Sequence, residues 1–306
     1  MSNPSADSQN FTVFVPVIEN KLYLANAPAK SKNNEYRYIS TSDYLEYSPL
    51  CDDFGPMNIS SVMRFIDLLQ EEMTYYSNKT IVYMADRGRR PLTNAAFLMG
   101  SYLILKLDYD PERVTKIFES IGPYAFEPFR DATFSPVDFG LSLMDCWKAL
   151  VKGKSLGWIR SPERPGAKWG MIGMEEYEHY ENPLNGDLVQ VVPNKFVAFK
   201  GPVDLPGGAV YQDEGGFRRF GPGYYVPVFR ALGVTTVVRL NERCYDELVF
   251  TRAGIRHVDL EFRDCTSPPA DVVTAFLEAA DETEGSVAVH CKAGLGRTGT
   301  LIALHM

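Results

Sequence analysis

The chain has 306 residues, a length that suggests about two domains. Its composition, 45% hydrophobic and 23% charged, is ordinary for a globular protein. Asp and Glu (39) outnumber Lys and Arg (31), giving a formal net charge of −8. That charge argues against a general binder of nucleic acids or anionic membranes, which need clustered positive charge, and it tolerates a basic substrate. No apolar run of roughly 18 residues exists, so we expect no membrane span.

The five cysteines are scattered and never form a CxxC pair. This usage indicates reduced thiols in the cytosol or nucleus rather than a disulfide framework or a zinc site. The four histidines are also dispersed. We therefore predict no metal and no cofactor.

The sequence contains an internal repeat. Residues 17–25 (VIENKLYLA) match 191–199 (VVPNKFVAF), and 81–90 (IVYMADRGRR) match 287–297 (VAVHCKAGLGR). The segments 81–90 and 287–297, each with the residues that follow it, are typical of a strand, a short loop that ends in Arg, and a helix. Met84 precedes Arg90 by six positions, as Cys291 precedes Arg297. We interpret the repeat as two copies of one α/β unit, with Met84 in place of Cys291; chance similarity is the alternative.

The repeat predicts the domain organisation. We expect a first domain over 1–150, a Gly-, Pro- and Lys/Arg-rich linker over 151–176, and a second domain over 177–306. The distance from Asn20 to Tyr83 is 63 residues, but that from Asn194 to His290 is 96, so the second copy carries an insertion. Amphipathic or capped patterns predict helices over 58–73, 111–122 and 270–281.

The segment 287–300 (VAVHCKAGLGRTGT) has the form strand, H-C-x5-R-[ST], helix. Such a strand delivers Cys291 to the carboxyl edge of a sheet, where α/β proteins place ligand sites. Gly294, Gly296 and Gly299 permit a tight curve of main-chain N–H groups, and a helix N-terminus adds positive charge. The same field favours a thiolate at Cys291. The predicted phosphate-binding loop comprises Lys292, Ala293, Gly294, Leu295 and Gly296.

The neighbouring polar residues receive distinct roles. Arg297 can grip two phosphate oxygens with its planar fork. The hydroxyl of Thr298 can donate to the sulfur, and His290 orders the loop rather than acting as a base. An alkoxide leaving group needs a general acid, and Asp264, on a loop between an apolar strand and a Pro-containing helix start, suits that role better than Asp259 or Asp271.

Two other interpretations of the segment were weighed. A Walker loop is excluded because GK[ST] is absent. Cys291 as a small buried hydrophobe remains the alternative to a nucleophile, but the preceding His, the Arg six positions later and the three glycines disfavour it.

The string HCKAGLGRTGT is similar to the signature of cysteine-dependent tyrosine and dual-specificity phosphatases. Within that group, the chain more closely resembles the cell-division-cycle-fourteen phosphatases. Five further segments carry this resemblance: LEYSPLCDDFGPMN, PFRDATF, EYEHYENPLNGDL, VTTVVRLNERCYD and HVDLEFRDCTSP. The resemblance covers about residues 20–306. It implies two tandem phosphatase-like domains of which only the second is catalytic, with Cys291 as nucleophile, Arg297 as phosphate-binding residue and Asp264 as general acid.

The resemblance also implies a substrate class and a place in the cell. Family members reverse Cdk phosphorylation at mitotic exit, and they prefer phosphoserine or phosphothreonine followed by proline and a downstream basic residue, with phosphotyrosine also accepted. An acidic groove formed partly by the first domain recognises the basic residue. We expect nuclear, nucleolar and cytoplasmic placement, including the spindle or centrosome. The matching groove positions are Asp131, then Glu127 and Glu119, for which solvated surface charge is the alternative, and an apolar wall that holds the proline could include Tyr124.

Family members continue past the catalytic helix with further helices, including a glutamine-bearing loop that positions water, whereas nine residues follow Arg297 here. We expect the second unit to lack those helices and to expose Leu301, Ile302 and Leu304. Two alternative functions stay open. One is a phosphoinositide phosphatase, since the CKAG start is shared with that group, although Leu295 and the net charge oppose it. The other is an inactive phospho-binding scaffold.

Overall fold

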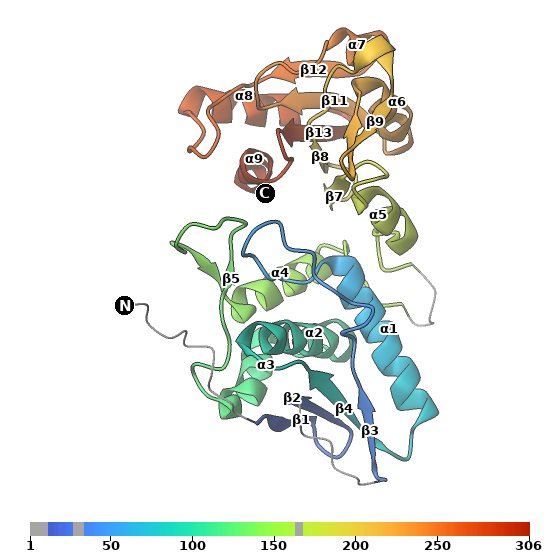
Figure 1. The fold of residues 1–306 in the computed structure, drawn as a ribbon, viewed down its shortest axis with the longest axis vertical. Coiled ribbons are helices and arrows are strands. Elements are labelled where there is room, and N and C mark those ends of the chain that lie inside the picture. The colour runs from blue at the N-terminus through green and yellow to red at the C-terminus, as the bar shows by residue number, and fades with distance from the viewer. Residues whose placement is uncertain (1–11, 27–33, 163–167) are drawn as a thin grey trace. The chain divides into compact units, whose positions relative to one another are not determined.

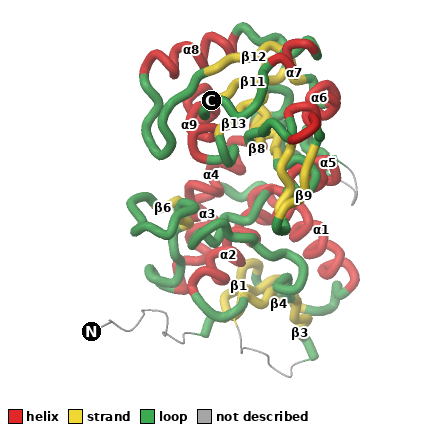
Figure 2. Tube along the Cα trace, turned by 45° about the horizontal axis from the view of Figure 1, so that its top comes forward, coloured by secondary structure: helices red, strands yellow, loops and turns green. Residues whose placement is uncertain are grey.

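The computed structural model describes residues 12–26, 34–162 and 168–306. The chain divides into two compact units, unit 1 up to Met171 and unit 2 from Ile172 to Met306. Each unit has its own sheet with its own helices, as Figure 2 shows in yellow and red. The fold is therefore α/β with two domains, as the repeat predicts.

Unit 1 is built on a four-stranded sheet of order β1-β2-β4-β3. Helix α1 begins at the cap Asn58, whose side chain accepts from the Ser61 N–H, and buries Val62, Phe65, Ile66 and Leu69. The elements are β1 (Phe14–Ile18), β2 (Leu22–Asn26), β3 (Tyr36–Ile39), α1 (Ile59–Tyr75), β4 (Thr80–Ala85), α2 (Arg89–Leu107), α3 (Pro111–Phe118), η2 (Glu119–Ile121), β5 (Phe129–Arg130), β6 (Gly140–Leu141) and α4 (Leu143–Ser155).

Unit 2 is built on a five-stranded sheet of order β12-β11-β13-β8-β7. Its elements are α5 (Met174–Glu181), β7 (Leu188–Val192), β8 (Phe196–Lys200), η3 (Pro206–Gly208), β9 (Tyr211–Glu214), β10 (Phe217–Phe220), α6 (Pro222–Ala231), β11 (Val234–Arg239), α7 (Leu248–Arg252), β12 (Arg256–Asp259), α8 (Ala270–Asp281), β13 (Ser286–Cys291) and α9 (Gly296–His305). The predicted helix over 270–281 is thus α8, and Asp271 lies in its first turn.

The two sheets repeat one topology. In each, an antiparallel hairpin (β1-β2 or β7-β8) continues into a parallel partner (β4 or β13), which has a second parallel neighbour (β3 or β11). Each hairpin turns on an asparagine in the left-handed region, Asn20 at φ 58° and Asn194 at φ 60°. Asn tolerates this conformation better than most residues. The insertion of unit 2 contains the β9-β10 hairpin, α6, α7 and β12.

The strand register corrects one detail of the predicted alignment. Cys291 lies opposite Lys200 on β8, and Ala85 lies opposite Asn26 on β2. Lys200 and Asn26 each stand six residues after the turn asparagine of their own unit. Ala85, not Met84, therefore occupies the strand position of Cys291. The spacing to the arginine misled the sequence comparison because the loop of unit 1 is one residue shorter.

The segment expected to be a linker, 151–176, is largely structured. Residues 151–155 are the last turn of α4, and Ile159 and Trp169 are buried. Up to Met171 the segment belongs to unit 1, and α5 begins at Met174 in unit 2. Residues 163–167 of the predicted linker lie outside the described residues. The Gly and Pro content suggested a linker. Composition alone cannot show that single Ile and Trp side chains within such a segment are buried.

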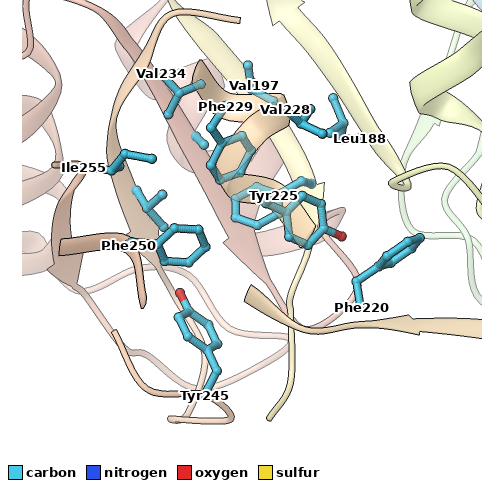
Figure 3. Packing of buried hydrophobic residues seen from close by; sticks show 13 residues of the cluster. Leu188, Val197, Phe220, Tyr225, Val228, Phe229, Val234, Tyr245, Phe250 and Ile255 are labelled. Carbon is cyan, nitrogen blue, oxygen red and sulfur yellow. The ribbon is translucent and has the colours of Figure 1, made fainter. Parts of the chain in front are cut away.

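The sheet of unit 2 is covered on both faces because neighbouring strand residues point to opposite sides. Phe199 contacts the aromatic rings of Tyr225 and Phe229 on α6. Figure 3 shows Tyr225 and Phe229 within this cluster. Phe196, three positions earlier, stacks with Phe276 on α8 and contacts His305 on α9. Figure 1 shows α6 and α7 on one side of this sheet and α8 and α9 on the other.

Helix α9 is better packed than the sequence suggests. Leu301 and Ile302 are fully buried, whereas Leu304 is 52% exposed. The expectation that all three are exposed is thus wrong for two of them, because α9 lies against β13 and contacts α8. Within residues 12–26, 34–162 and 168–306, no helix is both long and apolar enough to cross a bilayer.

Candidate active site

The candidate active site lies where β13 ends and α9 begins. Cys291 is the last residue of β13, and its side chain is buried. The loop 292–295 then turns into α9, which starts at Gly296. The predicted loop residues Lys292, Ala293, Leu295 and Gly296 are exposed and Gly294 is partly buried. The strand, loop and helix are those that the sequence predicts.

Only one of the three predicted loop glycines is required by the backbone. Gly294 has φ +74°, and a Cβ there would collide with the carbonyl oxygen of Phe199. At Gly296 and Gly299 a Cβ would meet nothing within 4 Å, and neither has a left-handed φ. The expectation that all three glycines shape the loop is therefore wrong for Gly296 and Gly299, because α9 has already begun there.

The electrostatics at Cys291 favour a thiolate. Burial by itself raises the pKa of the Cys291 thiol, but hydrogen bonds from the side chain and main-chain N–H of Thr298 and from the N–H groups of Gly294 and Leu295 outweigh it, so the pKa is lowered. The Thr298 side chain is fully buried, and its hydroxyl makes no hydrogen bond of standard geometry within the described residues. It is thus available to the sulfur.

Arg297 is buried and anchored by main-chain carbonyls. Its Nη1 donates to the carbonyl oxygens of Phe262 at 2.9 Å and Leu240 at 3.3 Å. Its Nε lies 3.2 Å from Oδ1 of Asp264, without the alignment of a hydrogen bond. These contacts fix the plane of the guanidinium.

Asp264 stands on a turn between β12 and α8, and its side chain is 62% exposed. Its Oδ1 accepts the N–H of Cys265, which has φ 56°. The sequence placed Asp264 on this loop, and the structure brings it to Arg297. Asp259 instead pairs with Arg239 at the end of β12, at an Nε–Oδ1 distance of 2.5 Å.

His290 is fully buried on the sheet face opposite Cys291. Its ring lies 4.8 Å from that of Phe199 in the α6 cluster, and successive strand residues alternate sides. Its Nδ1 is 3.0 Å from the carbonyl oxygen of Cys291. Burial lowers the pKa of His290 to about 3. A neutral ring on the far face cannot take a proton from the sulfur.

Sequence reasoning missed Gly201, which directly follows β8. A Cβ at Gly201 would collide with the carbonyl oxygen of Cys291 and come within 3.0 Å of Nδ1 of His290. Its N–H donates to the carbonyl oxygen of Lys292 at 3.3 Å. The available signal was the lone Gly at the end of the strand in VAFKGP, since such glycines mark close backbone approach.

The predicted substrate residues of unit 1 do not all gather. Glu119 and Glu127 line one pocket of about 390 Å³ together with Trp147. Glu127 also accepts from Nε of Arg90 at 2.9 Å. Asp131 and Tyr124 are exposed and are not among the residues that line this pocket.

Two family models match the chain. One, described as "Dual specificity protein phosphatase, N-terminal half", matches residues 16–153. The other, described as "Polymorphic toxin system, DSP-PTPase phosphatase", matches residues 225–306. The chain is 38% identical over 292 residues to dual specificity protein phosphatase CDC14A of Mus musculus, covering 94% of this chain and 46% of that protein.

The chain belongs to the CDC14 family. Human CDC14C is 37% identical, covering 90% of this chain and 59% of the relative. Tyrosine-protein phosphatase CDC14 of Candida albicans is 33% identical, covering 96% and 53%. The chain spans about half the length of the curated relatives it matches.

In the part of the chain that the structure describes, no three His, Cys, Asp or Glu side chains gather so that they could hold a metal ion. What the residues do offer is a thiol of lowered pKa beside the N–H groups of its loop, an anchored guanidinium and an exposed carboxyl group. This set suits capture of a phosphoryl group.

Proposed function

We propose that this CDC14-family chain is a dual-specificity protein phosphatase that acts through a phosphocysteine intermediate. The observation that carries the proposal is the Cys291 thiol, whose pKa is lowered by N–H groups of its own loop and by Thr298. The names of the relatives, which are dual specificity and tyrosine-protein phosphatases, support the same reaction class.

The reaction proceeds in two displacements. Sγ of Cys291 attacks the phosphorus, an S–P bond forms, and the P–O bond to the substrate breaks while Asp264 gives its proton to the leaving oxygen. Water then attacks the phosphorus and gives a proton back to the Asp264 carboxylate, the S–P bond breaks to re-form the Cys291 thiolate, and inorganic phosphate leaves. The phosphate oxygens accept hydrogen bonds from the loop N–H groups and from the guanidinium of Arg297. These bonds replace the contact that Arg297 makes with Asp264 in the ligand-free structure.

The first test separates this reaction from other hydrolysis. The wild-type chain should release phosphate from a phosphoserine-proline peptide with a downstream lysine, and Cys291→Ser should abolish that release because a serine hydroxyl is not ionised at neutral pH. Malachite-green detection of phosphate measures both. Wild-type turnover by Cys291→Ser would rule out the mechanism.

The second test concerns the acid. Asp264→Ala should slow the alkyl phosphopeptide by about 100-fold, in the range of a general acid, and p-nitrophenyl phosphate much less, since its phenolate leaves without a proton. Equal loss on the two substrates would show that Asp264 is not the proton donor. Asp259→Asn is a poor control because Asp259 holds Arg239; Asp271→Asn, exposed on α8, is the matched one.

The substrate preference is proposed from the family resemblance and from the charge of unit 1. Glu119 and Glu127 share a pocket, and Glu119 is exposed, so we propose that the pair, with Asp131, contacts the basic residue downstream of a phosphoserine-proline or phosphothreonine-proline site. Glu119→Gln should raise KM for the lysine-bearing peptide and leave a lysine-free peptide unaffected. An equal change on both peptides would argue against this assignment.

The two alternatives are outcomes of the same assays. Faster release from phosphoinositide vesicles than from peptide would favour a lipid phosphatase. Phosphopeptide binding without phosphate release would favour a scaffold.

We further propose that the protein acts in cell-cycle control in the nucleus, nucleolus and cytoplasm, with spindle or centrosome association. Fluorescence microscopy of the tagged protein through cell division would test this proposal.

A further inference from the structure

Two lysines stand next to the nucleophile on the β8 side of the site. Lys292 directly follows Cys291, and Lys200, the last residue of β8, lies opposite Cys291 in the strand register. Neighbouring strands are about 4.8 Å apart, and residues in register point to the same face of a sheet. The N–H of Gly201 donates to the carbonyl oxygen of Lys292 at 3.3 Å, which ties the phosphate loop to the end of β8. Both lysines therefore begin beside the sulfur.

Arg263 stands next to the catalytic groups on the side of the general acid. It lies between Phe262, whose carbonyl oxygen accepts from Nη1 of Arg297 at 2.9 Å, and Asp264, whose Oδ1 is 3.2 Å from Nε of the same guanidinium. Consecutive Cα atoms are about 3.8 Å apart, so Arg263 is flanked on both sides by contacts to Arg297. Its carbonyl oxygen accepts from the Thr266 hydroxyl at 2.7 Å, which holds the turn.

We call Lys200, Arg263 and Lys292 the basic rim, and their charges are only partly neutralised. Nζ of Lys200 lies 3.3 Å from Oδ2 of Asp187, and both side chains are 34% exposed. Arg263 and Lys292 are exposed, and within the part of the chain that the structure describes neither side chain makes an ion pair or a hydrogen bond. Since the nearby carboxylate of Asp264 is held by Arg297, these two cations are available to an anion from outside the chain.

We propose that the basic rim binds a second anionic group of a peptide substrate, close to the phosphoryl group that Cys291 attacks. The inference rests on the proposed function and adds a substrate class to it, namely phosphopeptides with an acidic side chain beside the phosphoserine. In the proposed substrate the downstream positions hold the proline and the lysine, so the acidic side chain stands upstream. The planar fork of Arg263 suits a carboxylate or a phosphate, and the lysine ammonium groups rotate to meet either.

Peptide binding to Cys291→Ser tests the basic rim without turnover, and fluorescence anisotropy of labelled peptides measures it. A phosphoserine-proline peptide with a downstream lysine and two upstream glutamates should bind about fivefold more tightly than the same peptide with glutamines, the upper end of what an exposed ion pair supplies. Added salt should reduce this ratio. Adding Arg263→Gln or Lys200→Gln should lower the ratio, and adding both should make the two affinities equal.

Two further variants separate charge from structure. Arg263→Lys keeps the positive charge and should retain most of the preference for glutamate. Arg252→Gln removes an exposed arginine at the end of α7 and should leave the ratio unchanged. A third peptide, with one upstream phosphoserine in place of the glutamates, identifies the anion: tighter binding than the glutamate peptide assigns the basic rim to a second phosphate, and weaker binding assigns it to a carboxylate.

Equal affinity for the glutamate and glutamine peptides, or a ratio that Arg263→Gln and Lys200→Gln leave unchanged, overturns the inference. Tighter binding of phosphoinositide vesicles than of any acidic peptide overturns the assignment to peptides. A wild-type chain that releases no phosphate from either peptide, while Cys291→Ser still prefers glutamate, overturns the proposed function instead. The two failures are therefore distinct.

Discussion

Two glycines confine the backbone of Cys291. A Cβ at Gly201 would strike the carbonyl oxygen of Cys291, and a Cβ at Gly294 would strike that of Phe199. Two main-chain segments therefore approach each other more closely than side chains allow. This crowding places the N–H groups of the loop at the sulfur, and it makes the site depend on residues outside the signature.

Gly201→Ala should lower the free energy of unfolding of unit 2 by about 1–3 kcal/mol, because backbone atoms must shift to admit the methyl group. Gly299→Ala is the matched control: it is exposed in α9 with open space around it, so it should raise stability by about 0.5–1 kcal/mol. Urea denaturation measures both. Equal changes in unfolding free energy for the two variants would contradict the close approach of Gly201 to the Cys291 carbonyl oxygen.

Among single residues, the sequence predicts the roles of those that lie close together in one motif. Cys291, Arg297 and Thr298 lie within one short motif, so their joint role was readable. Gly201 lies against the same loop but follows a distant strand, and its one signal is that it stands alone at the end of that strand. Asp264 is an intermediate case. The sequence predicted its position on a loop but not its contact with Arg297.

Among the elements, α9 decides how well the site is supported. It has 10 residues, a length at which an isolated helix is marginal in water. Its stability therefore comes from tertiary contacts, chiefly with β13 and through Leu301 and Ile302, both fully buried. Because α9 carries Arg297 and Thr298, loss of this packing would release both side chains from their positions next to the loop.

Leu301→Ala should cost about 2–5 kcal/mol of unfolding free energy, the range for a buried leucine. Leu304→Ala, at 52% exposure on the same helix, should change it by less than about 0.5 kcal/mol. Thermal or urea unfolding compares the pair. Similar losses for both would mean that α9 does not pack as described.

Element types and order were readable from periodicity, as α1 and α8 illustrate. The register was not. Ala85 stands at the strand position of Cys291 because the first loop is one residue shorter, and a sequence comparison can place that deletion on either side of Met84. The structured segment after α4 was also missed, since Ile159 and Trp169 are single apolar residues without a period.

Across the whole molecule, two residue types divide between the units. All three tryptophans belong to unit 1, namely Trp147, Trp158 and Trp169, and all four histidines belong to unit 2, namely His179, His257, His290 and His305. Tryptophan fluorescence therefore reports unit 1, and histidine protonation acts on unit 2. Each unit has its own sheet and core, so acid should affect the two differently.

Unit 2 should lose stability as the pH falls below about 6.5, the ordinary pKa of histidine. The pKa of His290 is lowered to about 3, so between these values the unfolded chain binds a proton that the folded unit does not, and stability rises with pH. At pH 5.5 the loss should be about 1 kcal/mol relative to neutral pH.

Pulsed hydrogen exchange of the β13 peptide in urea measures this loss, and tryptophan fluorescence gives the unit 1 midpoint in the same samples. The β13 midpoint should fall by more than the tryptophan midpoint between pH 7 and pH 5.5. A β13 midpoint that is equal at both pH values would contradict the buried, neutral state of His290.

In the proposed reaction, the sulfur of Cys291 attacks the phosphorus of the substrate. The most direct measurement is rapid mixing of the chain with p-nitrophenyl phosphate, which detects release of the phenolate before water frees the enzyme. A burst of about one phenolate per chain, with phosphate found on the Cys291 peptide by mass spectrometry and both absent in Cys291→Ser, is the predicted result. An undiminished burst in Cys291→Ser, or phosphate on another residue, would contradict it.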